Sequence, residues 1–408
     1  AIGRSALAVN TTGTQNVAVG ANALDANTTA SSNTAVGHIA LTANTTGDSN
    51  VGIGQRALTA NTTASNNTAV GTVTLLSNTT GTANTAVGTS ALQSNTTANN
   101  NTAVGRRSLL ANTTGLQNVA VGALALDANT TANDNVAVGY NSGTANTTGA
   151  SNTFVGSESA VANTTGHSNA AFGKRSLYTN STGVSNTALG KDALYANTTA
   201  NNNTAVGADA LTANTTGADN TACGSIAMLN NTTGSNNVAF GRNSLSNCTT
   251  GGSNTAVGTS TGDVTTTGSN NTTIGSGADP SSNSASNEVT LGNGSISSLR
   301  CNQTSISSLS DARDKTDIID LPLGLEFLNT LRPVKFKWQR REPDATDGKV
   351  RAGFIAQELQ EAQKDFNFLD LVMDNNPDKL EAKQGNLIPV LVKAIQELSA
   401  KVTALEAG

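Results

Sequence analysis

The stretch SSLSDARDKTDI, residues 307–318, brings hydroxyl, carboxylate and basic side chains close together in the sequence. It places a hydroxyl, Ser310, five residues before an amine, Lys315. A serine hydroxyl is a weak nucleophile unless a base takes its proton, and a lysine is that base in Ser-Lys sites. Since residues 310–408 contain no histidine, Lys315 is the nearest base available to Ser310.

The spacing of the two residues sets conditions on this chemistry. Residues five apart face opposite sides of a strand and lie about 140° apart on a helix, so a sharp bend or a neighbouring chain must bring them together. A lysine base must also be neutral, which requires burial. Asp311, Asp314 and Asp317 oppose neutrality unless they are directed elsewhere. The competing interpretation makes Ser310 a turn or cap residue, with Asp311 and Asp314 favouring a helix N-terminus.

These residues follow a long region of different composition. Residues 1–287 contain eight Lys or Arg and ten Asp or Glu, against 23 and 28 in the whole chain. All six prolines lie at position 280 or later. We therefore expect two physically different parts, a shaft at 1–287 and a second domain at 310–408, joined by a β-rich junction at 288–309.

Residues 1–275 repeat every 17 positions without insertion or deletion; one copy is TAVGADALTANTTGADN, residues 204–220. Glycine recurs from Gly3 to Gly275, an apolar residue precedes each glycine, and a mostly leucine position lies four residues after it. Such a period is typical of a solenoid. Gly, Asn and β-branched residues favour coils of short strands and turns. The recurring asparagines predict hydrogen-bonded ladders along the rod.

We expect valine and alanine to fill the narrow interior of this rod, which leaves the leucine column exposed unless another subunit covers it. A trimer or other cyclic oligomer would cover that column. The predicted fold is therefore mainly β: a trimeric parallel β-solenoid of 17-residue coils, followed by a small α+β domain.

The second domain has its own pattern. Residues 323–331 predict a short helix, 333–338 a half-buried strand, and GFIAQELQEAQ a strand running into a helix. From residue 387 to 407 a heptad pattern predicts a coiled-coil helix, although a helix packed on its own domain is the alternative. The predicted seam, for trimerisation, consists of Ile388, Leu391, Ile395, Leu398, Val402 and Leu405.

Several functions are disfavoured. The net charge of −5 without a basic block argues against nucleic-acid binding, and no apolar run of about 18 residues predicts membrane insertion. Three cysteines at unrelated spacings and two distant histidines predict no metal site and no cofactor. The NTT triplet is a glycosylation sequon, but a glycan on every coil would be too crowded. Consecutive threonines point to opposite faces of a strand, so they do not form an ice-binding face. The acidic residues of the rod are scattered and do not form the carboxylate pair that a glycosidase needs.

The repeat NTAVGxxAL resembles the head repeats of trimeric autotransporter adhesins, which form left-handed parallel β-rolls, and equally the shaft repeats of bacteriophage tail fibres. LSDARDK at 309–315, PV at 333–334, GFIAQE at 353–358 and IPVLVKAIQEL at 388–398 resemble the C-terminal intramolecular chaperone of endosialidase-type tail spikes and fibres. This second resemblance covers residues 310–408. Asp314 departs from the commonest form of the motif, which has an apolar residue there.

The second resemblance implies a domain that trimerises the fibre and then cleaves the chain between Leu309 and Ser310. Ser310 would be the nucleophile and Lys315 its base, in a protease of a single turnover at most. Asp311 and Glu358 are possible auxiliary residues, but Glu358 is equally well explained as a solvated helix residue.

The function that we expect is a homotrimeric phage tail-fibre shaft. It would be assembled in the bacterial cytoplasm, displayed on the virion, and partnered by an unidentified glycan or protein receptor of the host surface. The virion-attachment region is expected to precede this sequence. The alternatives are a bacterial surface adhesin of the same roll, or a fibre with an uncleaved trimerisation cap.

Overall fold

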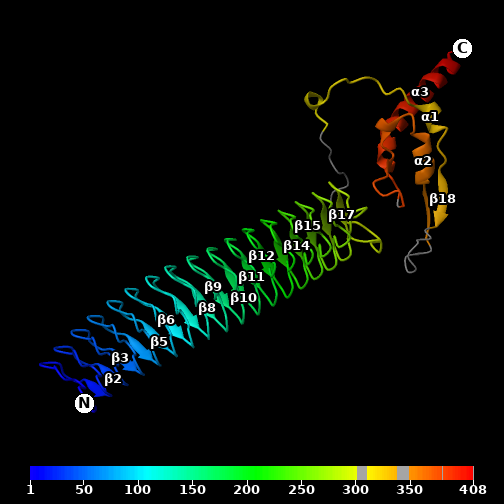
Figure 1. Ribbon diagram of the computed structural model, residues 1–408. Helices are drawn as coiled ribbons and strands as arrows, with labels where there is room; N and C mark the ends of the chain where they lie inside the picture. The colour runs from blue at the N-terminus through cyan, green and yellow to red at the C-terminus, as the bar shows by residue number, and fades with distance from the viewer. Residues whose placement is uncertain (301–309, 338–348, 379, 408) are drawn as a thin grey trace. The chain divides into compact units, whose positions relative to one another are not determined.

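A computed structural model describes residues 1–300, 310–337, 349–378 and 380–407. The chain forms two compact units, Ala1–Leu291 and Gly292–Gly408 (Figure 1). Leu309, on one side of the predicted cleavage point, lies outside the described residues, as do Cys301 and Trp338.

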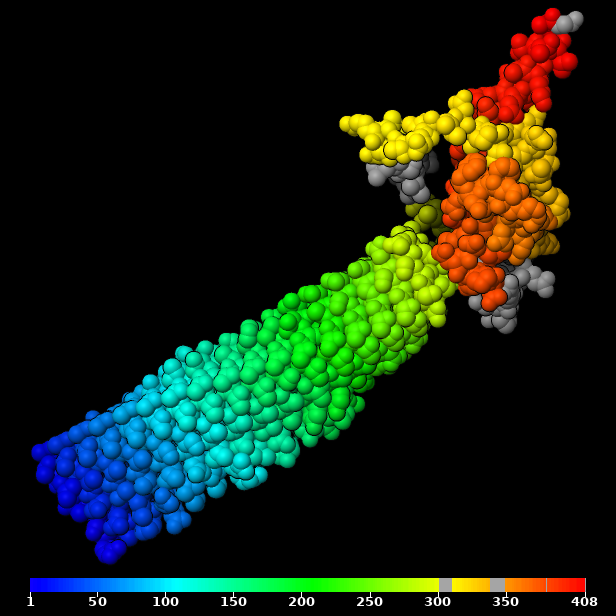
Figure 2. Space-filling model, turned by 45° about the horizontal axis from the view of Figure 1, so that its top comes forward, coloured from blue at the N-terminus to red at the C-terminus, as the bar shows by residue number. Residues whose placement is uncertain are grey.

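Unit 1 is a parallel β-solenoid of 17-residue coils, so this part of the predicted fold is confirmed. Each coil contributes one short strand, which pairs in parallel with the strands 17 residues before and after it. Figure 2 shows these coils packed into a continuous rod. The strands are β1 Val17–Val19, β2 Thr34–Val36, β3 Val51–Ile53, β4 Thr68–Val70, β5 Thr85–Val87, β6 Thr102–Val104, β7 Val119–Val121, β8 Val136–Val138, β9 Thr153–Val155, β10 Ala170–Phe172, β11 Thr187–Leu189, β12 Thr204–Val206, β13 Thr221–Cys223, β14 Val238–Phe240, β15 Thr255–Val257, β16 Thr272–Ile274 and β17 Val289–Leu291.

The leucine column lies inside the solenoid, and the expectation that it would be exposed is wrong. We use this name for the residues four after each glycine, such as Leu41, Leu58 and Leu92, which are fully buried. Their φ angles of 48° to 55° are left-handed, including those of the variants Met228 and Ala160. This conformation turns the backbone so that the leucine side chain enters the interior.

The expected interior valines instead lie on the outer face of the sheet. Side chains alternate along a strand, so the central alanine of a Thr-Ala-Val strand points inward and its two neighbours point outward. The central residue is buried in β1 through β16, while the last residue is only partly covered or exposed. We call these last residues, which directly precede each glycine, the valine column. Val87 is 36% exposed, Leu189 48% and Phe240 58%.

Two asparagine ladders run along the interior, as predicted. In the first, Asn44 Nδ2 donates to Asn27 Oδ1 at 3.1 Å and to the Gly47 carbonyl at 2.9 Å. In the second, Asn33 Oδ1 accepts from the Asn50 backbone N–H at 2.8 Å. Because buried polar groups are costly unless they are hydrogen-bonded, these bonds make the polar interior tenable.

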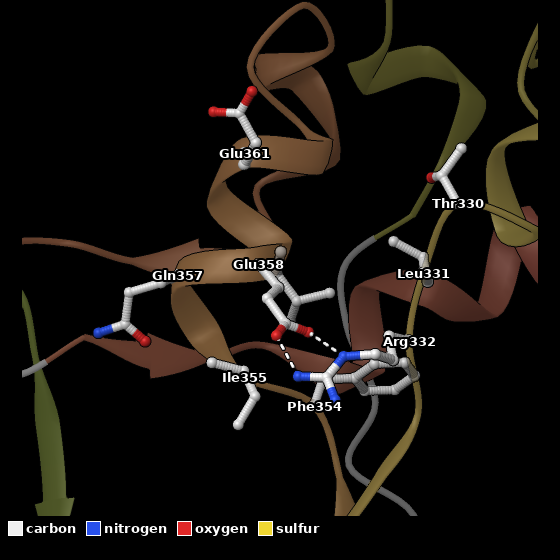
Figure 3. Close-up of a pocket in the computed structure, with 9 residues that line it drawn as sticks. Thr330, Leu331, Arg332, Phe354, Ile355, Gln357, Glu358 and Glu361 are labelled. Atoms are coloured by element: carbon white, nitrogen blue, oxygen red, sulfur yellow. Dashed lines mark hydrogen bonds and ion pairs between the residues drawn. The ribbon is translucent and has the colours of Figure 1, made fainter.

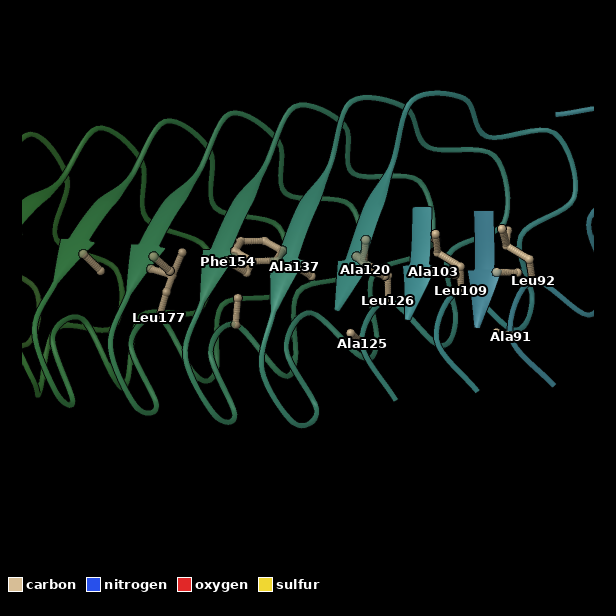
Figure 4. Packing of buried hydrophobic residues seen from close by; sticks show 14 of the residues in the cluster. Ala91, Leu92, Ala103, Leu109, Ala120, Ala125, Leu126, Ala137, Phe154 and Leu177 are labelled. Atoms are coloured by element: carbon tan, nitrogen blue, oxygen red, sulfur yellow. The ribbon is translucent and has the colours of Figure 1, made fainter. Parts of the chain in front are cut away.

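One coil departs from the repeat in its core. Phe154 occupies the central position of β9, where most other strands have alanine, and it is fully buried (Figure 4). The leucine position of the preceding coil is Gly143, and that of its own coil is Ala160. A Cβ atom on Gly143 would lie 2.7 Å from Phe154 Cδ2. The large ring therefore uses space that a leucine fills elsewhere.

Unit 2 is small and mixes helices with antiparallel strand pairs. The pairs are β18 with β19 and β20 with β21. Its elements are the 3₁₀ turn η1 Ala312–Asp314, α1 Leu325–Leu328, β18 Val334–Lys337, β19 Val350–Gly353, α2 Ala356–Ala362, η2 Asn367–Leu369, β20 Val372–Met373, β21 Glu381–Ala382, η3 Gln384–Leu387 and α3 Ile388–Glu406. The short helix, the strand, the strand-to-helix segment and the C-terminal helix predicted from the sequence are all present. The junction differs, because Ile296 and Leu299 lie exposed beyond β17 and not in further strands.

The core of unit 2 explains how α3 is held. Val390 and Ala394 are its buried residues, and Val390 belongs to a cluster with Phe327 of α1 and Leu359 of α2. Glu397 adds a polar contact, since its carboxylate accepts from the Leu325 backbone N–H at 2.8 Å. One face of α3 therefore packs on its own unit.

Candidate functional site

The structure brings Ser310 and Lys315 together within one chain. Lys315 Nζ donates to Ser310 Oγ at 2.6 Å. The bend between them is η1, whose single turn lies between two extended residues, Asp311 and Lys315. The Asp311 carboxylate accepts from the Arg313 backbone N–H at 2.9 Å and caps the turn. A short capped turn thus satisfies the requirement for a sharp bend, without a neighbouring chain.

The turn also directs one of the nearby acids away from the lysine. Arg313 Nη2 donates to Asp311 Oδ2 at 2.6 Å. This side-chain hydrogen bond, with that from the backbone N–H, holds the pKa of Asp311 below its usual range. Asp311 therefore caps the turn and pairs with Arg313, and its hydrogen bonds are not to Ser310 or Lys315.

The Ser310–Lys315 pair is exposed in the single chain. An ammonium group that donates to the hydroxyl does not act as a base. Proton transfer needs the neutral amine with the hydroxyl donating to it, and burial is what favours a neutral lysine. The arrangement supplies the distance for Ser-Lys chemistry, but the single chain does not bury the pair.

Glu358 lies elsewhere in unit 2, in a cavity of about 430 Å³ (Figure 3). Its carboxylate pairs with Arg332, whose Nε lies 3.1 Å from Glu358 Oε2. This hydrogen bond lowers the pKa of Glu358 and raises the pKa of Arg332. The cavity is lined by Thr330, Leu331, Arg332, Phe354, Ile355, Gln357, Glu358, Leu359 and Glu361.

Glu358, expected as a possible auxiliary residue, does not lie at the Ser310–Lys315 pair. Within the described residues, Glu358 contacts Arg332 and not Ser310 or Lys315. Glu358 lies in α2, and its side chain is 42% exposed and ion-paired with Arg332. The ion pair of Arg332 with Glu358 was not predicted, because the two residues are 26 positions apart and no short sequence pattern links them.

The predicted seam of α3 is exposed along its whole length. Its six residues are between 45% and 81% exposed, whereas Val390 and Ala394 on the other face are buried. The packed-helix alternative is confirmed for one face of α3, which lies on unit 2. The heptad face is uncovered, and the coiled coil predicted for it stays a prediction. Those six residues are Ile388, Leu391, Ile395, Leu398, Val402 and Leu405.

Two further properties concern ligands and membranes. No helix in the described part of the chain is both long and apolar enough to cross a bilayer. Across residues 1–300, 310–337, 349–378 and 380–407, no three or more His, Cys, Asp or Glu side chains are grouped so that they could hold a metal ion.

Comparison with known proteins gives one match. Residues 310–368 match the family described as chaperone of endosialidase. The match begins at Ser310 and ends before β20, β21 and α3, so it covers less than the predicted 310–408. No match was found among curated proteins or among solved structures.

Proposed function

We propose that this protein is the shaft of a homotrimeric phage tail fibre, which is aligned by its C-terminal part and then cleaved between Leu309 and Ser310. The observation that carries the proposal is the 2.6 Å contact of Lys315 Nζ with Ser310 Oγ, at the first residues of the segment that matches the chaperone family. A Ser-Lys cleavage requires a hydroxyl within hydrogen-bond reach of an amine that can act as its base, and this contact supplies that distance.

The position of Ser310 determines the reaction. Because Ser310 provides the nitrogen of the bond to be broken, attack of its Oγ on the Leu309 carbonyl carbon is an acyl shift from nitrogen to oxygen. Lys315 takes the hydroxyl proton and gives it to the nitrogen of Ser310 as the C–N bond breaks, so the nitrogen leaves as the amine of Ser310 and Lys315 is neutral again. Water then hydrolyses the ester, which releases a carboxylate on Leu309 and restores the Ser310 hydroxyl.

The exposure of the pair supports a timed reaction. In a single chain both side chains of the pair are exposed. A neighbouring chain that covers η1 would desolvate the amine and favour its neutral form. Cleavage would therefore follow assembly, and the separated shaft would be held by kinetic stability.

Two uncovered apolar surfaces support assembly from copies of one chain. The valine column and the α3 seam both expose large apolar side chains in a regular line. A long apolar stripe on a soluble protein marks an interaction surface. Because every coil resembles the next, strands could pair out of register, and a trimer formed at α3 would set the register first.

Cleavage is tested by the intact mass of the denatured protein, for the parent chain and for Ser310→Ala and Lys315→Ala. Lys364→Ala is the matched control, since Lys364 is an exposed lysine of the same unit. We expect the parent and the control to split between Leu309 and Ser310, and the two site variants to stay whole. An uncleaved parent that is folded and trimeric would instead make unit 2 a permanent trimerisation cap.

The trimer is tested by native mass and by oxidation of Cys223, which lies in the valine column. In a Cys301→Ser background, copper-catalysed oxidation should link two of the three chains through Cys223. Cys223→Ser removes the link, and Cys248 is too buried to replace it. A monomeric native mass would overturn the trimer.

A further inference from the structure

Two consecutive coils of the shaft carry the same unusual sequence. They read GKRSLY and GKDALY, residues 173–178 and 190–195, and these tyrosines are two of the three in the chain. The tyrosine position, five residues after the glycine, is threonine in four other coils, at Thr42, Thr59, Thr144 and Thr212. The first residue after Gly173 and after Gly190 is lysine. The lysine and tyrosine side chains of these two coils point outward.

The two tyrosines form one aromatic unit. The rings of Tyr178 and Tyr195 are stacked, with centroids 5.0 Å apart and planes 5° from parallel. Arg175 lies over the Tyr195 ring at 5.4 Å from its centroid. In the described part of the chain, neither tyrosine hydroxyl has a hydrogen-bond partner. A rigid, half-buried ring pair therefore presents two hydroxyl groups that are free to bind a ligand.

A charged network fixes this ring pair and leaves positive charge beside it. Arg175 makes two contacts of 2.8 Å with the Asp192 carboxylate, whose side chain is only 8% exposed. Lys191 Nζ lies 3.0 Å from the same carboxylate but remains 59% exposed, and Lys174 is exposed as well. Within these two coils three cations lie beside one largely buried acid. The coils before and after them carry Glu158 and Asp209 at the repeat position of Arg175, and Glu158 acts on Arg175. Lys174 and Lys191 are therefore the exposed cations available to an anionic group beside the rings.

The basic residues of the shaft are not scattered. All eight Lys and Arg of residues 1–287 lie one or two positions after the repeat glycine, along a single edge of the solenoid: Arg4, Arg56, Arg106, Arg107, Lys174, Arg175, Lys191 and Arg242. Tyr140 also lies on this edge, directly after Gly139, but its coil and the coils before and after it contain no Lys or Arg, so the coils of residues 173–195 alone place tyrosines beside cations. This combination separates the two coils from the rest of the edge.

We propose that Tyr178, Tyr195, Lys174 and Lys191 form a binding site for an acidic oligosaccharide. The apolar face of a sugar ring would pack on the tyrosines, its hydroxyls would bond the phenol groups, and its carboxylate or phosphate would pair with the lysines. Two coils span only about 10 Å of the shaft. A stable protein partner needs roughly 800 Å² on each side, so a narrow saccharide fits this patch better than a folded protein does.

The site rests on the proposed function only for its location, because a fibre shaft is displayed outside the cell. Binding itself is independent of cleavage and is measured on the full chain. Native mass and intact mass, recorded on the same samples, report assembly and cleavage separately from binding.

The test is saturation-transfer NMR with three probes: trigalacturonate, a mannose 6-phosphate oligosaccharide and neutral maltotriose. The variants take residues from other coils of the shaft, namely Tyr178→Thr with Tyr195→Thr, and Lys174→Ala with Lys191→Ala. Arg106→Ala, at the same repeat position as the lysines in a coil without tyrosine, is the control. The carboxylated and phosphorylated probes distinguish the two anionic sources.

We expect at least one acidic probe to bind, maltotriose to bind about tenfold more weakly, and the tyrosine variant to lose about tenfold in affinity. The lysine variant should bind more weakly and lose its salt dependence, while Arg106→Ala stays unchanged. The proposal is overturned if neither acidic probe binds at millimolar concentration, or if both variants bind as the parent does. A tyrosine variant that loses its oligomeric native mass would assign the patch to subunit packing and equally overturn it. Should that variant fail to fold, the lysine variant decides.

Discussion

Around Phe154, one large residue replaces an alanine of the repeat, and the small residues Gly143 and Ala160 replace two leucines. We expect these changes to compensate one another in stability. Phe154→Ala removes a fully buried ring, and such truncations cost roughly 3–5 kcal/mol. Gly143→Leu in the parent should also destabilise by about 1–3 kcal/mol, since a Cβ at 143 already meets Phe154 Cδ2 at 2.7 Å and Leu126 Cδ2 at 3.1 Å. The φ of Gly143, 59°, is close to that of the leucines at this repeat position, so backbone strain is not the cause.

The double variant should cost much less than the sum of the two changes. With the ring removed, the leucine side chain that Gly143→Leu introduces would fill the space that leucine fills in other coils, and Ala160→Leu would complete the return to the repeat. We expect a favourable coupling of about 2 kcal/mol or more between positions 143 and 154. The prediction therefore concerns the sign of an interaction and is insensitive to the reference state of either single variant.

Hydrogen exchange is the suitable assay, because a repeat array need not unfold in one step. The Gly156 N–H, which donates to the Val138 carbonyl at 2.8 Å, reports on the strand pairing beside Phe154. A loss of about 3 kcal/mol in local stability corresponds to exchange faster by roughly 100-fold. Additivity of the two changes within about 0.5 kcal/mol would refute the compensation and leave Phe154 as an incidental substitution.

Three further predictions test separate features. Gly190→Ala should destabilise the stacked coils of the solenoid by roughly 3 kcal/mol or more, because the φ of Gly190 is 142° and a Cβ would meet the Gly207 carbonyl oxygen at 2.4 Å. Chemical denaturation measures this loss, and Gly252→Ala, whose Cβ would lie 3.1 Å from its nearest atom, should cost far less in the same assay. Since Arg332 lowers the pKa of Glu358, the pair stabilises unit 2 above the unfolded-state pKa of Glu358, and this contribution is lost as the pH falls through the folded-state pKa. When unfolding is followed as the pH is lowered, Glu358→Gln should lack that loss of stability. The same pH dependence in the parent and in Glu358→Gln would contradict the pairing. Burial raises the pKa of Cys248 to about 11, so in a Cys301→Ser chain a thiol reagent at about pH 8 should leave Cys248 unmodified until denaturant is added. Labelling of Cys248 in the native protein would contradict its buried position.

The solenoid was predictable from the sequence, but the direction of its side chains was not. A strict period identifies stacked coils whatever their cross-section. The interior was misassigned because leucine normally avoids positive φ, and here the coil needs that conformation at Leu41 and its equivalents. Once Leu41 turns inward, the three-residue strand leaves room for alanine inside and places valine outside.

The Ser310–Lys315 pair was predictable only in part. The residue types suggested the chemistry and the spacing demanded a bend, but a bend and a neighbouring chain were equally open. What decides between them is the cap that Asp311 forms with Arg313, a contact that local sequence permits without requiring. The partner of Glu358 could not be inferred, because Arg332 reaches it through the tertiary packing of unit 2.

Because each strand pairs with the strands 17 residues before and after it, the shaft can become longer or shorter only by whole coils. Each coil bonds only to the coils before and after it, and the ladder of Asn27 to Asn44 is the same bond as that of Asn44 to Asn61. A gene that gained or lost 51 nucleotides in frame would lengthen or shorten the rod by one coil and break no type of contact. The coils around Phe154 are an exception, because the Phe154 ring packs where Gly143 and Ala160 leave space, so these coils must be kept as a group. The length of the rod could thus change while the C-terminal unit stays the same.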